Sequence, residues 1–136
     1  MKLFTRIFLA LMALAFMKVG IEALINPQAV VAQVGITLEN ASALSSIRAI
    51  YGGMHFVFGL FCVWGILRDP DSALRLIMLY TAGFIVGRIS GIVSDGMPNP
   101  FVITWAITES VSFLIAGFIF TNGFRRFTTQ KIQSAV

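Results

Sequence analysis

Charged side chains are scarce in this sequence. Only 12% of its 136 residues are Asp, Glu, Lys or Arg, whereas 57% are hydrophobic. An average soluble domain carries about 25% charged residues, so the deficit excludes an ordinary water-soluble domain and is typical of a membrane protein. Because one bilayer-spanning helix needs roughly 20 apolar residues, four such helices occupy most of the chain. We therefore expect a single membrane domain covering residues 1–136.

Cysteine and histidine occur only once each. The single thiol, Cys62, excludes an intrachain disulfide and a relay between two thiols, and we interpret it as a small buried apolar residue. A lone imidazole, His55, excludes bis-histidine haem, and the two residues together are too few ligands for a tetrahedral zinc site. We therefore expect no metal and no cofactor. For His55 itself, proton handling and a hydrogen bond to Glu109 or to a backbone carbonyl are the two interpretations.

Four long apolar segments are what the chain does contain. They predict an all-α fold, a four-helix transmembrane bundle, with spans at about residues 3–25, 46–67, 73–94 and 101–121. Proline disfavours helix at the residue before it, so Asn26-Pro27 ends the first span. Ser45 or Ser46 is the expected N-cap of the second span and Ser72 that of the third. Asn122-Gly123 is expected to end the fourth.

Two segments lie outside these spans. Residues 26–45 form the longest connection, and because long loops are usually functional, we expect this one to fold back on the mouth of the bundle or to lie in the membrane interface. Residues 122–136 form a basic tail. No stretch is left for a second domain.

The net charge of +4 is concentrated on one side of the predicted membrane. That side holds Lys2, Arg6, Arg68, Arg75, Arg125, Arg126 and Lys131. The loops of the other side hold only Glu39 and Asp95, with Arg48 at a helix start. Since cytoplasmic loops are rich in Lys and Arg, both termini and the basic tail should be cytoplasmic and residues 26–45 external. The charge thus predicts contact with anionic lipids rather than with nucleic acid.

Each span carries a charged or titratable residue at a similar depth. With a helix rise of about 1.5 Å per residue, Lys18, His55, Arg88 and Glu109 all lie roughly 10–13 Å inside the external surface. Residues seven apart nearly superpose on a helix, so Arg48, Gly52, His55, Gly59 and Cys62 form one stripe on the second span. Each span carries such a stripe of polar or small residues, and the four stripes are expected to face one lumen. The full candidate cluster is Lys18, Glu22, Arg48, His55, Arg88, Asp95, Trp105 and Glu109.

Arg88 and Glu109 are the best single pair in this set. They match in depth, and a six-residue turn joins their helices. An ionisable residue inside a membrane is expensive and usually marks a functional site. Three interpretations of the cluster stay open: a structural clasp that fixes helix pairing, a ligand-binding pocket open to the outside, and a transport or proton pathway.

Small residues recur every fourth position in the third span. Gly83, Gly87 and Gly91 form a G-x-x-x-G-x-x-x-G pattern, which lets two helix backbones approach closely. We expect the stripe to pack inside the bundle, with Ala49 and Gly53 as the matching surface. Contact with a second subunit is the alternative.

Several short motifs resemble a known family. They are Arg48-Ala49-Ile50-Tyr51-Gly52-Gly53, Gly87-Arg88-Ile89-Ser90-Gly91, Asp95-Gly96 and Glu109. With these motifs the chain resembles an uncharacterised group of small bacterial four-span membrane proteins, a domain of unknown function distantly similar to DoxX-like proteins. The resemblance covers residues 3–120. It implies a multi-pass protein of the bacterial inner membrane with these Arg, Asp and Glu positions as family features, and it implies no activity.

Three function hypotheses follow. The first is a non-enzymatic membrane protein whose buried charged cluster binds a small polar, amphipathic or lipid ligand, or stabilises a partner membrane subunit. The second is a small transporter or channel component, which would need a homodimer or larger complex with the glycine face at the interface. The third is a membrane enzyme on a lipid-like substrate with Glu109 and His55 as acid and base.

Overall fold

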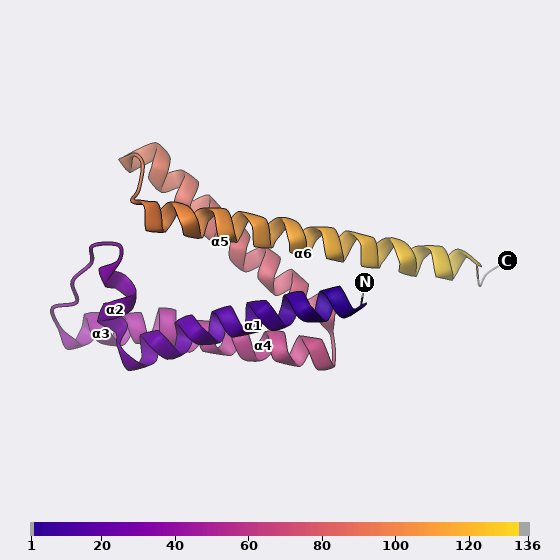
Figure 1. Cartoon of the computed structure of the whole chain (residues 1–136), viewed down its shortest axis with the longest axis horizontal. Coiled ribbons are helices and arrows are strands. Elements are labelled where there is room, and N and C mark those ends of the chain that lie inside the picture. The colour runs from indigo at the N-terminus through magenta and orange to yellow at the C-terminus, as the bar shows by residue number, and fades with distance from the viewer. Residues whose placement is uncertain (1, 134–136) are drawn as a thin grey trace.

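The computed structural model describes the backbone of residues 2–133 and the side chains of residues 2–122. The described backbone is helical, without strands (Figure 1). Its elements are α1 (Lys2–Ile25), α2 (Pro27–Ala32), α3 (Ala41–Ile47), the π-helix η1 (Arg48–Met54), α4 (His55–Leu67), α5 (Pro70–Asp95) and α6 (Pro100–Gln133). Because α3, η1 and α4 are continuous, four helices in this part of the chain are long and apolar enough to cross a membrane. The chain is therefore a multi-pass membrane protein.

The second span begins earlier than predicted. Asn40 is its N-cap, since its side-chain oxygen accepts a hydrogen bond of 2.9 Å from the Ala43 N–H. The prediction of Ser45 or Ser46 was wrong because Ser46 lies inside the helix, where its hydroxyl donates to the Ser42 carbonyl. Serine and threonine hydroxyls within helices commonly donate a hydrogen bond to the carbonyl four residues earlier.

Asp69, not Ser72, caps the third span. The Asp69 carboxylate accepts from both the backbone N–H and the hydroxyl of Ser72. Pro70 occupies the first helical position, which suits a residue with a fixed φ and no N–H to satisfy. The hydrogen bonds from Ser72 lower the pKa of Asp69, so the cap carries a negative charge at the positive end of the helix dipole.

Helix α6 continues through the predicted stop at Asn122-Gly123 and reaches Gln133. The Asn122 amide donates back to the Phe118 carbonyl at 2.9 Å, so it supports the helix rather than a turn. A glycine inside a helix costs only about 1 kcal/mol, which the longer helix tolerates. The basic side chains predicted for the tail lie outside the described side chains.

The spans form two antiparallel hairpins. Helix α1 lies along η1 and α4, and α5 lies along α6 (Figure 1). Glycine lets the helices of the first hairpin approach closely: a Cβ on Gly20 would lie only 2.7 Å from the Phe56 nitrogen and 3.0 Å from the Gly52 oxygen. Small residues therefore permit the close helix approach between α1 and the second span.

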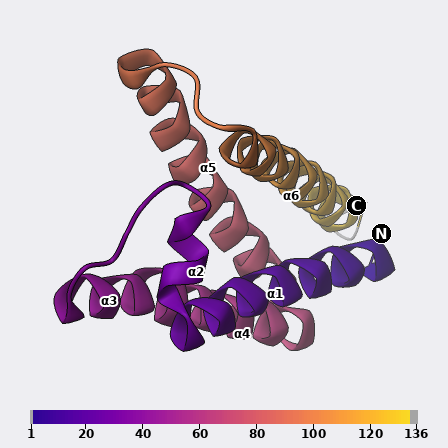
Figure 2. The same cartoon turned by 60° about the vertical axis from the view of Figure 1, so that its left-hand side comes forward.

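The hydrophobic core lies toward one end of the molecule, near the N-terminus of α1 and the turn between α4 and α5. Its buried members are Phe8, Leu9, Ala13, Phe16, Cys62, Ala73, Leu74, Ile77, Ala116 and Ile119. At the opposite end, here called the loop end, α5 rises away from α1 and η1 (Figure 2). The hairpins thus pack together at one end and diverge at the loop end.

Residues 26–40 fold back across the loop end. This agrees with the first of the two expectations for residues 26–45, that the segment folds back on the mouth of the bundle. The side chain of Asn99, in the turn between α5 and α6, donates to the Gln33 carbonyl at 3.0 Å. In Figure 2, α2 and the chain after it stand on the side of the first hairpin that faces α5. The segment, which belongs to the first hairpin, therefore also contacts the second hairpin.

The prediction of four polar stripes around one lumen was wrong. In the second span Gly52, His55 and Cys62 are buried, as expected for one face, but Arg48 is exposed. It lies at the start of the π-helix η1, whose wider turns break the seven-residue periodicity on which the prediction depended. On α1, the face that carries Lys18 is exposed as well.

Candidate functional site

A bidentate ion pair joins α5 to α6. Arg88 Nε lies 2.6 Å from Glu109 Oε2, and Arg88 Nη2 lies 2.8 Å from Glu109 Oε1. The Glu109 side chain is only 7% exposed, and that of Arg88 is 22% exposed. Two parallel charge-assisted hydrogen bonds fix the planes of both groups and are stronger than neutral ones. The pair that depth and the short turn indicated in the sequence is thus present in the structure.

A second polar contact joins α4 to α5. The buried His55 shares a hydrogen bond of 2.7 Å between its Nε2 and the Tyr80 hydroxyl, and its Nδ1 lies 3.1 Å from the Ile50 carbonyl. A carbonyl oxygen can only accept, so Nδ1 carries a proton. In the neutral ring Nε2 is then the acceptor, and Tyr80 donates. Both ring nitrogens are therefore occupied, one by a backbone carbonyl.

Aromatic rings surround this contact. Tyr51 stacks on the His55 ring with a centroid distance of 5.6 Å and an interplanar angle of 16°. Phe16 of α1 meets the Tyr80 ring edge-on at 4.8 Å. Offset and edge-on pairs of this kind are favourable beyond their buried area. Both tyrosines of the chain thus lie beside its one histidine.

Phe84 connects the two polar contacts. Its ring lies 4.7 Å from that of Tyr80, and the Arg88 guanidinium carbon lies 5.8 Å from its centroid. A cation above an aromatic face is attracted to it. The residues Tyr51, His55, Tyr80, Phe84, Arg88 and Glu109 are here called the polar cluster. They come from three of the four spans.

The π-helix shapes one side of the polar cluster. The π-helix η1 contains Ile50 and Tyr51, and its last residue, Met54, directly precedes His55. The carbonyl that the imidazole contacts belongs to the residue five positions earlier, within this wider helical segment. π-helical turns occur frequently at functional sites, and here the turn positions the stacked Tyr51 and the acceptor for His55.

Three charged residues of the candidate cluster lie elsewhere. Lys18 and Glu22 pair with each other at 2.6 Å, with side chains 71% and 52% exposed. Arg48 donates to the Leu24 carbonyl at 3.2 Å, at the end of α1. Similar depth did not bring them to the polar cluster, because each found a nearer partner on the first hairpin. Their inclusion in one internal network was wrong.

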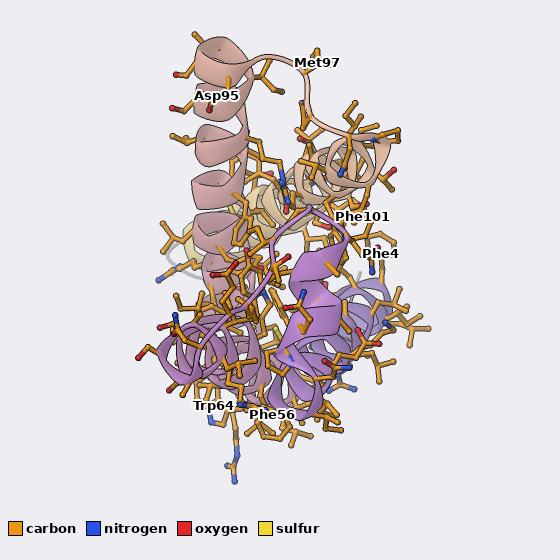
Figure 3. All side chains as sticks on the ribbon, turned by 90° about the vertical axis from the view of Figure 1, so that its left-hand side faces the viewer. Phe4, Phe56, Trp64, Asp95, Met97 and Phe101 are labelled. Atoms are coloured by element: carbon orange, nitrogen blue, oxygen red, sulfur yellow. The ribbon has the colours of Figure 1, made fainter. Side chains whose placement is uncertain are left out.

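Asp95 and Trp105 are also separate from the polar cluster. Asp95 is the last residue of α5 and is exposed at its tip (Figure 3). Trp105 is partly buried one helical turn before Glu109, and its ring lies edge-on to that of Phe101 at 6.2 Å. Neither side chain forms a hydrogen bond or an ion pair with the side chain of Arg88 or Glu109.

The glycine stripe of α5 does not pack inside the described chain. A Cβ added at Gly83, Gly87 or Gly91 would find no atom within 4 Å. The prediction of internal packing against Ala49 and Gly53 was wrong because α5 diverges from the first hairpin at this level. The glycines with close neighbours lie instead on α1, η1 and α4: Gly20, Gly52, Gly59 and Gly65.

Sequence reasoning missed the aromatic members of the site. Because the predicted cluster was based on charge, it did not include Tyr51, Tyr80 and Phe84. A signal was present: residues four apart share a helix face, which relates Tyr51 to His55 and Phe84 to both Tyr80 and Arg88. Phe16, on α1, carried no local signal.

Among the described residues, no three or more His, Cys, Asp or Glu side chains form a group that could hold a metal ion. The polar cluster offers hydrogen-bond donors, a charge pair and aromatic faces. Comparison with curated proteins and with solved structures finds no match to the chain. A family model described as a domain of unknown function, DUF4345, matches residues 4–120. The chain therefore belongs to the DUF4345 family.

Proposed function

We propose that this protein is a non-enzymatic, multi-pass protein of the bacterial inner membrane whose polar cluster binds a small polar or amphipathic ligand. Both termini are cytoplasmic, and the loop end faces outward. The uneven distribution of Lys and Arg supports this orientation. The polar cluster then lies in the outer half of the membrane, and an ionisable residue inside a membrane is by default a candidate functional site.

The uncovered side of α5 carries the proposal. Ala73, Tyr80 and Gly87 are seven residues apart and share one face. Ala73 packs against Gly65 of α4, and Tyr80 binds His55, but Gly87 has open space. The face that meets the first hairpin therefore becomes free directly beyond the polar cluster, so a ligand can lie there with its polar group on the cluster.

Arg88 is suited to hold that polar group. A guanidinium has five N–H donors, and the two described bonds to Glu109 leave others available on a partly exposed side chain. Glu109 neutralises the charge and fixes the orientation of Arg88, which makes an arginine tolerable at this depth. The ligand group that fits is a hydrogen-bond acceptor, with an apolar body against α5.

Native mass spectrometry of protein extracted in mild detergent tests this proposal. We expect a co-purified small molecule on the parent protein and its loss in Arg88→Lys, which keeps a positive charge near Glu109 but loses the donor fork. Glu22→Gln is the matched control, because it removes a carboxylate from the exposed ion pair of α1. Equal retention by the parent, Arg88→Lys and Glu22→Gln contradicts the proposal.

A second candidate is a dimeric transporter or channel component. In its favour, only 11% of the most apolar 18-residue stretch of α5 is buried, against 33% for α1. The glycines of α5 also have open space around them. A cysteine at Gly91 in a Cys62→Ala background should then crosslink between two copies. A strictly monomeric particle in mild detergent argues against it. Acid–base catalysis has no comparable support, since His55 and Glu109 are each held by other partners.

A further inference from the structure

We infer that residues 26–40, here called the strap, close the loop end over the polar cluster and are held there by a latch between Asn99 and Gln33. This inference rests on the proposed binding site and concerns access to it. The strap leaves the first hairpin and meets the turn of the second. Opening and closing of the strap then control entry from the external side.

The strap is folded by its own side chains. Asn26 caps α2 by accepting from the Ala29 N–H at 3.2 Å. The Gln28 side chain donates to the Ile36 carbonyl at 3.0 Å and accepts from the Leu38 N–H at 2.7 Å. Gly35 supplies the turn between them with a φ of 79°, a conformation that favours glycine. These hydrogen bonds give the exposed turn of the strap a defined conformation on α2.

Buried residues seat the base of the strap on the first hairpin. Pro27 and Val31 of α2 are buried, whereas residues 32–37 are exposed. The attached part is thus α2, and the part that reaches toward the second hairpin is the exposed turn. An exposed turn on an anchored base can swing without unpacking the core.

The latch itself is a single exposed hydrogen bond. Asn99 Nδ2 donates to the Gln33 carbonyl at 3.0 Å, while its Oδ1 accepts from the Val102 N–H at 3.0 Å and caps α6. One amide thus starts α6 and holds the strap. Because an exposed hydrogen bond exchanges with water at little net cost, this contact can break and reform while both hairpins stay folded.

The position of the latch places the strap over the uncovered face. The His55–Tyr80 bond joins the hairpins at the polar cluster, and the Asn99–Gln33 bond joins them at the loop end. Gly87 and Gly91 of α5 lie between these two levels and have open space around them. Gly87 is exposed beside the strap rather than touched by it, so a closed strap would slow entry from the external solution without contacting this part of α5.

Labelling of an introduced cysteine tests the strap without a ligand. In a Cys62→Ala background, Gly87→Cys adds a thiol at a position with room for a side chain. Its reaction rate with a water-soluble maleimide is measured in lipid nanodiscs. Asn99→Asp keeps an oxygen to cap α6 but removes the donor to Gln33. We expect it to raise the labelling rate at least three-fold, and Gln28→Ala to do the same.

A cysteine at Ser42, exposed on α3, is the matched reference and should react equally with and without Asn99→Asp. Equal rates for Gly87→Cys with and without the latch, whether fast or undetectable, overturn the inference, as does an equal change at Ser42→Cys. The two proposals fail separately. Faster labelling in Asn99→Asp with no molecule retained by any variant supports the strap and counts against the binding site.

Discussion

The Arg88 guanidinium and the Glu109 carboxylate face each other through two parallel hydrogen bonds across α5 and α6. This ion pair and the His55–Tyr80 bond share the Phe84 ring as a neighbour of Tyr80 and Arg88. Three spans are therefore joined through polar groups at one level. Four comparisons of variants test what these and other contacts of the chain contribute.

Glu109→Gln should lower the free energy of unfolding in detergent by about 3 kcal/mol, the lower end of the range for breaking one side of a buried pair, because Arg88 keeps some exposure. Equilibrium unfolding followed by circular dichroism measures the change. Glu22→Gln, in the exposed pair of α1, should cost less than about 1 kcal/mol. Similar losses in both variants would mean that burial does not increase the contribution of the Arg88–Glu109 pair to the free energy of unfolding.

Tyr80→Phe should destabilise the protein by about 1–3 kcal/mol, since it leaves a buried acceptor, His55 Nε2, without its donor. The ring contacts with Phe16 and Phe84 are preserved, so any loss reports on the hydroxyl. Tyr51→Phe keeps the stack on His55 and is the reference variant. Thermal unfolding compares them, and an effect of Tyr51→Phe as large as that of Tyr80→Phe would refute the assigned role.

Gly20→Ala and Gly87→Ala should have opposite outcomes. At Gly20 the new methyl group meets the backbone of Phe56 at 2.7 Å, and overpacking of this kind costs about 1–3 kcal/mol. At Gly87 it meets nothing, and alanine favours a helix over glycine by about 1 kcal/mol. Unfolding in detergent measures both. A destabilising Gly87→Ala that also lowers the apparent mass would instead place this face in a subunit contact.

Asp69 should make the start of α5 sensitive to acid. Hydrogen bonds from Ser72 lower the pKa of Asp69 when the protein is folded. The charged cap therefore contributes stability above the ordinary carboxyl pKa of about 3.9, and this contribution is lost as the pH falls through the lowered value. Asp69→Asn keeps a neutral cap. The difference in melting temperature between parent and variant should be constant above pH 5 and shrink toward pH 3.

Much of the fold was predictable because span identity depends on composition. Runs of about 20 apolar residues correctly indicated four helices. Arg88 and Glu109 could be paired because they lie at similar depths on helices joined by the turn at 96–99, and short connections place helices side by side. Helix ends were harder to predict, since Asp69 and Ser72 are both good caps and only the position of Pro70 distinguishes them.

The direction in which each polar residue faces could not be read from the sequence. Lys18 and Glu22 satisfy each other one turn apart on α1, so their depth carried no information about a partner on another helix. In the second span, the π-helix rotates Arg48 away from the face that holds His55.

By itself, the sequence determined that four segments are long and apolar enough to cross a membrane and that Arg88 and Glu109 have each other as the nearest opposite charge in depth. Only the tertiary structure decided that the hairpins pack at one end and diverge at the other, that Tyr80 binds His55, and that the glycines of α5 stay uncovered. The reason is physical. Hydrophobicity sets where each residue sits across the bilayer, whereas the packing of side chains between helices sets which neighbour it meets.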